Sequence, residues 1–201
     1  MKVLGITGGA GAGKSEILSY MKRQYGAHVI LADLVSHELQ EPGGLCYQPV
    51  VEAFGGQILR EDGSIDRERL GRIVYADREK LELLNHLMHP AIKTAIQREI
   101  ASVRAKQEVP FIAVEAALML EDHYETFLDE IWYVHADAAI RGRRMQTARG
   151  YSAEKVRRVL ENQKKEDEYR QACHFVIDNS GDFVENTVVQ IDKGLVEHGF
   201  L

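Results

Sequence analysis

The stretch Val3–Ser15, VLGITGGAGAGKS, decides the fold of this chain. Its short apolar run leads directly into Gly8-x-x-x-x-Gly13-Lys14-Ser15, the spacing of a phosphate-binding P-loop. Glycines let the backbone form a nest whose N–H groups point at anionic oxygens, and a helix beginning near Lys14 adds its positive end. The expected phosphate-binding residues are Gly8, Gly9, Ala10, Gly11, Ala12, Gly13, Lys14, Ser15 and Glu16.

The residue types in this loop indicate a nucleoside triphosphate with Mg²⁺, as Mg-ATP or Mg-GTP. Lys14 can reach the β- and γ-phosphates, and Ser15 supplies a hydroxyl of the kind that ligates Mg²⁺. The alternative is a glycine-rich turn that matches the pattern by chance. The next residues oppose it, because SEILSYMKRQYG has apolar side chains spaced for one helical face. A dinucleotide fingerprint is disfavoured, since it requires a third glycine where Lys14 stands.

Length and composition favour a single catalytic domain that acts on small molecules. The chain has 201 residues and a formal charge of −6, which argues against a general nucleic-acid surface or an anionic membrane surface. The two cysteines, Cys46 and Cys173, form no CxxC pair, so neither a disulfide framework nor a cysteine zinc site is expected. No apolar run is long enough for a secretory signal or a membrane span, and we expect a cytoplasmic protein.

The order of apolar and amphipathic segments predicts an α/β fold with a five-stranded parallel sheet and helices on both faces. A long helix-rich block, Leu34–Gln107, separates the second strand from the third; we interpret its first half as an acceptor-binding insertion and Ala91–Lys106 as a helix returning to the sheet. A second helical block, Asp137–Arg170, resembles a kinase lid with a break at Gly150-Tyr151. The expected strands are Lys2–Thr7, His28–Ala32, Pro110–Glu115, Glu130–His135 and His174–Asp178.

Two acids follow predicted strands, where ligands collect in parallel sheets. Asp33 suits a catalytic base beside the P-loop edge, because phosphoryl transfer needs a group that orients or deprotonates the acceptor. It suits equally well the N-cap of a helix beginning at Leu34. Glu115 suits a ligand of Mg²⁺ through water or a group that orients the acceptor; the alternative is a solvated strand end. His89 precedes Pro90, and from spacing alone it marks a helix boundary.

The lid block is rich in arginine, whose forked guanidinium grips phosphate oxygens bidentately. For any single arginine, a solvated basic helix face is the simpler interpretation. We nevertheless expect at least one of them to contact phosphate when the lid closes. The six residues are Arg141, Arg143, Arg144, Arg149, Arg157 and Arg158.

Several motifs in fixed order resemble the dephospho-coenzyme A kinase family. After GITGGAGAGKS come LADLVSHELQEPGG, VVEAFGGQIL with REDGSIDRERLGRIVYAD, LNHLMHPAI and FVIDNSGD, so the resemblance spans nearly the whole chain. It implies a P-loop core at about 1–33, 91–136 and 171–201, an acceptor-binding insertion at about 34–90 and a lid at about 137–170. The implied reaction transfers the ATP γ-phosphate to the ribose 3′-hydroxyl of dephospho-CoA, the last step of coenzyme A synthesis.

The resemblance also implies roles for single residues. Asp33 matches the family's proposed base, Lys14 the P-loop lysine and Arg143 the lid arginine. Asn179 and Gly181 match the segment near the adenine, and Arg149 a second phosphate contact. We also expect His89 and Glu115 to bind the acceptor. Two positions depart from the family pattern: Leu31 stands where many members have the first acid of Asp-Ala-Asp, and Glu16 replaces a common threonine. Neither departure removes a required group.

Two other functions remain open from the residues alone. A kinase for a nucleoside monophosphate or another small metabolite shares the P-loop, the insertion and the arginine-rich lid. A nucleotide-dependent switch would use the P-loop to control partner binding. Against the switch, the chain has no clear apolar strand ending in Asp. The expected partners are ATP and dephospho-CoA, with neither nucleic acid nor membrane; the sequence leaves the oligomeric state open and is compatible with a monomer.

Overall fold

The computed structural model describes residues 1–181 and 183–201, so Asp182, the last residue of the FVIDNSGD segment, lies outside the described residues. The chain forms two compact units. One comprises Met1–Ile30 together with Ser102–Leu201, and the other comprises Leu31–Ala101.

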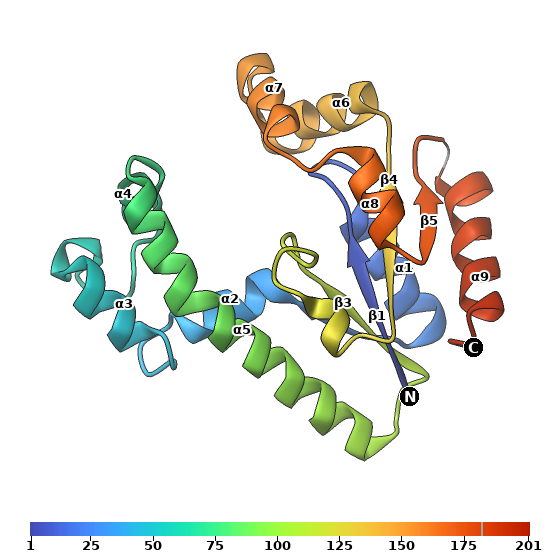
Figure 1. Ribbon diagram of the computed structural model, residues 1–201, viewed down its shortest axis with the longest axis horizontal. Helices are drawn as coiled ribbons and strands as arrows, with labels where there is room; N and C mark the ends of the chain where they lie inside the picture. The colour runs from blue at the N-terminus through green and yellow to red at the C-terminus, as the bar shows by residue number, and fades with distance from the viewer. Residues whose placement is uncertain (182) are drawn as a thin grey trace. The chain divides into compact units, whose positions relative to one another are not determined.

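A five-stranded sheet in the order β2-β3-β1-β4-β5 forms the centre of the fold (Figure 1). The pairs β1–β3, β1–β4 and β4–β5 are parallel. The predicted α/β fold is confirmed, and the observed bounds lie within two residues of the predicted ones. The strands are β1 (Lys2–Thr7), β2 (His28–Leu31), β3 (Phe111–Glu115), β4 (Glu130–His135) and β5 (Phe175–Asp178).

The central strands are mostly apolar and buried, because helices cover them. In β1 every residue after Lys2 is buried, and β3 is buried up to Glu115. This is the continuous hydrophobic pattern of strands covered on both faces. Helix α1 (Lys14–Tyr25) buries Ile17, Leu18 and Met21, the apolar face expected from the sequence. Helix α9 (Val188–Glu197) packs along β5. The P-loop therefore follows the most deeply buried strand.

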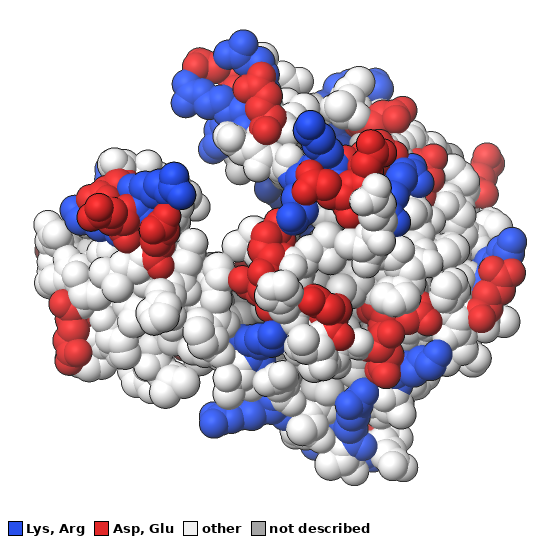
Figure 2. Space-filling model, in the orientation of Figure 1, with Lys and Arg blue, Asp and Glu red and all other residues white. Residues whose placement is uncertain are grey.

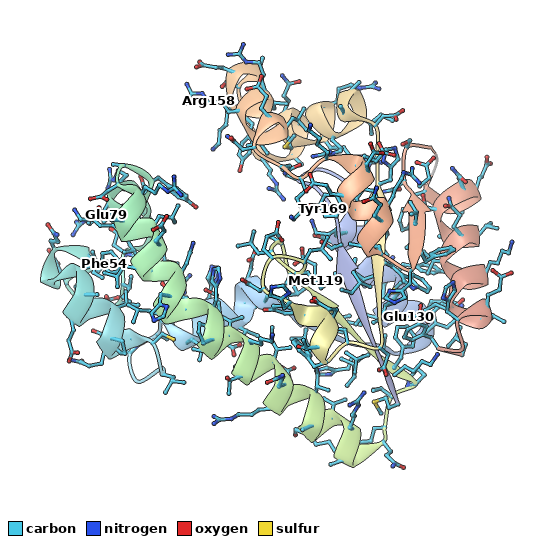
Figure 3. The ribbon with its side chains drawn as sticks, viewed as in Figure 1. Phe54, Glu79, Met119, Glu130, Arg158 and Tyr169 are labelled. Atoms are coloured by element: carbon cyan, nitrogen blue, oxygen red, sulfur yellow. The ribbon has the colours of Figure 1, made fainter. Side chains whose placement is uncertain are left out.

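The lid block forms three helices, α6 (Ala138–Arg149), α7 (Ala153–Glu161) and α8 (Glu166–Ala172). Helices α6 and α7 lie beyond the end of β4 in Figure 1. The predicted break is confirmed: Gly150 has φ 62° and ends α6, with its N–H donating to Gln146 O. Figure 3 shows Tyr169 on α8 beside the sheet, where its ring stacks on Tyr133 of β4 with centroids 4.6 Å apart.

The second unit is a helical body with a core of its own. It contains α2 (Ala32–Leu39), α3 (Tyr47–Phe54), α4 (Arg67–Tyr75) and most of α5 (Arg78–Lys106). Asp66 caps α4, because its carboxylate accepts from the N–H groups of Glu68 and Arg69. The buried cluster comprises Cys46, Val50, Phe54, Ile58, Ile65, Leu70, Val74 and Met88.

The expected helix boundary at His89-Pro90 is wrong. Helix α5 continues through Pro90 as one 29-residue element. A proline inside a helix removes one backbone hydrogen bond and costs about 3 kcal/mol. Residues on both sides of Pro90 pack against the buried cluster of the second unit, including Met88, Ala91 and Ile92. Burial of these side chains offsets the loss, so tertiary packing overrides the local signal.

Among residues 1–181 and 183–201, the structure has no helix with the length and apolar character required to span a bilayer.

Candidate active site

The loop between β1 and α1 has the strained glycine geometry that its sequence predicts. Gly8, Gly11 and Gly13 have φ of 147°, 79° and 96°, a range that L side chains rarely adopt. A Cβ on Gly8 would lie 2.5 Å from the carbonyl oxygen of Val134 in β4. The backbone therefore lies directly against the sheet, and Gly13 is the N-cap residue of α1. A helix N-terminus after such a loop is an anion-binding site.

Lys14 lies at the centre of this site. Its Nζ donates to Gly8 O at 2.7 Å and lies 3.5 Å from Glu115 Oε1. Strand register explains the second contact, because Ile6 of β1 pairs with Glu115 of β3. The Lys14 and Glu115 side chains are only 14% and 17% exposed. Glu115 is thus a shielded carboxylate next to the P-loop lysine, and its interpretation as a solvated strand end is wrong.

Two lid arginines contact the loop from α6. The Nε of Arg141 donates to Ala10 O at 2.9 Å, and Arg144 Nη1 donates to Ala12 O at 3.3 Å. Burial lowers the pKa of the Arg141 guanidinium, while the phenols of Tyr133 and Tyr169 act in the opposite direction. Arginine remains charged throughout the physiological range. Two positive charges therefore lie at the rim of the loop.

Asn179 is fully buried and fixes the loop from the other side. Its Nδ2 donates to Ala12 O at 2.8 Å, and its Oδ1 accepts from Thr187 Oγ1 at 2.9 Å. Its backbone oxygen accepts from Arg144 Nη2 at 3.0 Å. A Cβ on Gly13 would collide with the Asn179 amide. The amide therefore buttresses the P-loop directly.

A shallow pocket of about 520 Å³ lies beside the loop, between α6 and the turn after β5. Arg143, an exposed residue, and Gly181 both line it. The turn is built by short contacts: Ser180 N donates to Asp178 Oδ1 at 2.9 Å, and Asp137 N donates to Ser180 Oγ at 3.0 Å. The full lining is Ile140, Arg143, Arg144, Thr147, Ala148, Ser180 and Gly181.

The other lid arginines differ in their surroundings. Arg149 is exposed and is the last residue of α6. Arg157 and Arg158 pair along α7 with Glu161 and Glu154, and both are about 70% exposed. Basic and glutamate side chains lie beside one another on this helix in Figure 2, and Arg158 points outward in Figure 3. For Arg157 and Arg158, the solvated-face interpretation is confirmed.

Two residues expected at the acceptor side belong to the second unit. Asp33 is exposed and is the second residue of α2, which begins at Ala32. The N-cap interpretation of Asp33 is therefore wrong, because Leu31 occupies that position. The helix follows β2 directly, with no connecting residue, and a carboxylate in its first turn complements the helix dipole. His89 is half-buried within α5.

The first unit thus brings together the P-loop, Lys14, Glu115 and Asn179, and it holds the pocket between α6 and the turn after β5. Arg141 and Arg144 donate hydrogen bonds to the loop, and sequence reasoning could not separate them from the neighbouring arginines. Their spacing of three residues, which places them on one helix face, was the available signal. Such an arrangement can hold a triphosphate and offset its charge.

Comparisons with known proteins agree with this geometry. The family model described as "Dephospho-CoA kinase" matches residues 2–185. A dephospho-CoA kinase of Symbiobacterium thermophilum is 34% identical over 96% of this chain and 79% of its own length. One from Carboxydothermus hydrogenoformans is 34% identical over 95% of this chain and 91% of its own length. The solved dephospho-CoA kinase of Campylobacter jejuni superposes with a TM-score of 0.73 over the whole of both chains at 21% identity, which supports the fold. The chain belongs to the dephospho-CoA kinase family.

Proposed function

We propose that the protein transfers the γ-phosphoryl group of ATP to the ribose 3′-hydroxyl of dephospho-CoA, which yields CoA and ADP. The observation that carries this function is the P-loop with Lys14 held between Gly8 O and Glu115, in a chain whose family match covers residues 2–185. The P-loop supports ATP as the phosphoryl donor, and the family match supports dephospho-CoA as the acceptor.

The P-loop explains how the phosphoryl donor, ATP, binds. The backbone of Gly8–Glu16 binds the phosphates, and Lys14 exchanges its contact with Gly8 O for β- and γ-phosphate oxygens. The adenine occupies the pocket lined by Gly181. Asn179 keeps the loop in its binding conformation through the hydrogen bond from its Nδ2 to Ala12 O. Arg143, which lines that pocket, and Arg149 are the proposed further phosphate contacts from the lid.

The residues present fit Mg²⁺ as the cofactor. Ser15 presents a hydroxyl in the first turn of α1, and the Glu115 carboxylate lies against Lys14 on the same edge of the sheet. Mg²⁺ prefers oxygen ligands and keeps water and substrate phosphates among them. Ser15 would hold the ion directly, and the ion would neutralise charge on the β- and γ-phosphates.

Phosphoryl transfer then requires an oriented acceptor more than covalent chemistry. Asp33 accepts the proton of the 3′-hydroxyl as the oxygen attacks the γ-phosphorus. Lys14 and Arg143 offset the charge that develops on the transferring group. His89 and Glu115 are the proposed contacts on the acceptor side.

We further propose the division of the chain that these roles imply. The core comprises about 1–33, 91–136 and 171–201, the acceptor-binding insertion about 34–90, and the lid about 137–170. A metabolic kinase with these substrates would act in the cytoplasm.

Replacement of the proposed base tests the mechanism. Asp33→Asn keeps the size of the side chain and removes the proton acceptor, so kcat should fall about 10²- to 10⁴-fold while the Kd for ADP changes little. The matched control is Glu38→Gln, which neutralises an exposed acid on the same helix and should leave kcat unchanged. If Asp33→Asn retained the wild-type kcat, Asp33 would not be the base.

A further inference from the structure

Two segments of the lid, the first turn of α6 and the connection between α7 and α8, meet at the same point of the P-loop. Arg141, in the first turn of α6, donates through Nε to Ala10 O at 2.9 Å. Its Nη2 donates to the side-chain oxygen of Gln163, which lies in the short connection between α7 and α8. One guanidinium thus joins the beginning of the lid, the loop, and the α7–α8 connection at residues 162–165 (the lid's return connection).

The packing around Gly9 shows how closely these groups approach the loop. A Cβ on Gly9 would collide with both the Arg141 guanidinium and the Gln163 amide oxygen. A Cβ on Gly11 would lie 2.7 Å from the backbone oxygen of Arg141. The absence of side chains at these two glycines therefore lets the Arg141–Gln163 pair rest directly on the loop.

The connection that carries Gln163 is anchored on both sides. Asn162 N donates to Arg158 O at the end of α7, and Lys165 N donates to Glu168 Oε1 at the beginning of α8. Lys164 lies 3.5 Å from Glu121, in the segment after β3. With its backbone fixed in this way, Gln163 holds the Arg141 guanidinium at little additional cost in conformational entropy.

The chemistry of the pair indicates a role beyond packing. An amide oxygen orients a guanidinium without cancelling its charge, whereas a carboxylate would orient and neutralise it. The loop binds a polyanion, so a fixed positive charge at its rim, which pairs with no carboxylate of residues 1–181 and 183–201, strengthens nucleotide binding. Because its Nε donates to Ala10 O, Arg141 also limits the conformations available to the loop before a nucleotide binds. The loop therefore loses less conformational entropy on binding.

We propose that Gln163 is a positioning residue for ATP binding: it holds the Arg141 guanidinium on the P-loop and thereby couples the lid's return connection to occupancy of the nucleotide site. The inference rests on the proposed role of the loop as the ATP site. It assigns Gln163 an effect on nucleotide affinity and leaves the transfer step to other residues.

A double-mutant cycle tests this coupling. Calorimetric titration with Mg-ADP measures Kd for the wild type, Gln163→Ala, Arg141→Met and the double variant, and steady-state assays give kcat and KM for ATP. Each single change should raise Kd and the KM for ATP about 5- to 10-fold with kcat within about twofold. The double variant should match Arg141→Met alone, because the glutamine acts only through the arginine.

Two further variants separate positioning from structural support. Gln163→Glu retains the acceptor oxygen, so its melting temperature should not fall below the wild type, yet Kd for ADP should rise because the added carboxylate neutralises Arg141. Glu161→Gln changes an exposed acid at the end of α7 that pairs with Arg157, away from Arg141, and should leave Kd for ADP unchanged.

Three results would overturn the inference: an unchanged Kd in Gln163→Ala, a double variant whose loss equals the product of the single losses, or a Gln163→Glu variant that binds ADP as tightly as the wild type. ADP binding needs no acceptor. Loss of coupling and failure of the proposed dephospho-CoA reaction are therefore distinguishable in the same set of proteins.

Discussion

Replacing Asn179 by alanine should damage both the stability of the fold and the nucleotide site. The side chain is fully buried and joins Ala12 O in the loop to the Thr187 hydroxyl. Alanine removes both hydrogen bonds at once and leaves their two partners in a buried environment. The substitution therefore tests whether this amide is a structural support of the P-loop.

The structure sets the size of the effect. Leaving a buried polar group without its partner costs about 1–3 kcal/mol, so two such groups give about 2–6 kcal/mol. Ala12 O retains a longer contact with Arg144 Nη1 at 3.3 Å, and Thr187 Oγ1 can still donate to Asp178 O at 3.5 Å. We therefore expect about 2–4 kcal/mol in the free energy of unfolding, the lower part of that range. For a chain of this size the melting temperature should fall by roughly 4–16 °C.

Urea unfolding gives the change in free energy, and titration with Mg-ADP gives the change in affinity. The matched control is Thr187→Val, which removes the donor to Asn179 Oδ1 but keeps the bond from Nδ2 to Ala12 O. It should cost about 1–2 kcal/mol and leave the Kd for ADP unchanged. A loss below about 1 kcal/mol in Asn179→Ala, or equal losses of ADP affinity in both variants, would refute the reasoning.

Three further predictions follow from other contacts. Lys14→Ala should lower kcat/KM for ATP by about 10²-fold or more, since it removes the cation that meets the β- and γ-phosphates; a near-normal steady-state value would contradict this role. Gly194→Ala should destabilise the fold by about 1–3 kcal/mol, because the added Cβ would lie 2.9 Å from Trp132 Cη2. Gly71→Ala, whose Cβ would lie 3.7 Å from its nearest neighbour, should stabilise the fold by about 0.5–1 kcal/mol, and thermal unfolding compares these two helical sites. Burial raises the pKa of Asp178, but the Ser180 hydroxyl and N–H hold that pKa below its ordinary value, so the wild type should be more stable than Asp178→Asn above about pH 4 and lose this advantage as the pH falls through the native-state pKa. If acid unfolding curves showed that the advantage persisted at low pH, this carboxylate would not be its source.

The P-loop and the sheet could be predicted from sequence because their signals are local. Glycine spacing and Lys14 fix the loop, and an apolar run before it fixes β1. The errors arose where tertiary contacts override local preferences. Pro90 lies inside α5 because Met88, Ala91 and Ile92 belong to or pack against the core of the second unit. Helix α2 begins at Ala32, directly after β2, and the local sequence does not indicate this start.

The contacts around the loop could not be predicted because they depend on how distant segments pack. Arg141, Arg144 and Gln163 reach the loop across more than 130 residues of sequence. Among six lid arginines, only the three-dimensional structure separates those that face the loop from those that pair with glutamates along α7. The role of Asn179 as a buttress likewise depends on its burial.

The most direct test of the proposed function is acceptor-dependent formation of ADP from Mg-ATP by the purified protein, with the mass of the product determined. The account predicts conversion of dephospho-CoA to a product heavier by one phosphoryl group and identical to CoA, with little turnover when AMP or adenosine replaces it. Turnover of ATP with another acceptor, or with none, and no conversion of dephospho-CoA would contradict the account.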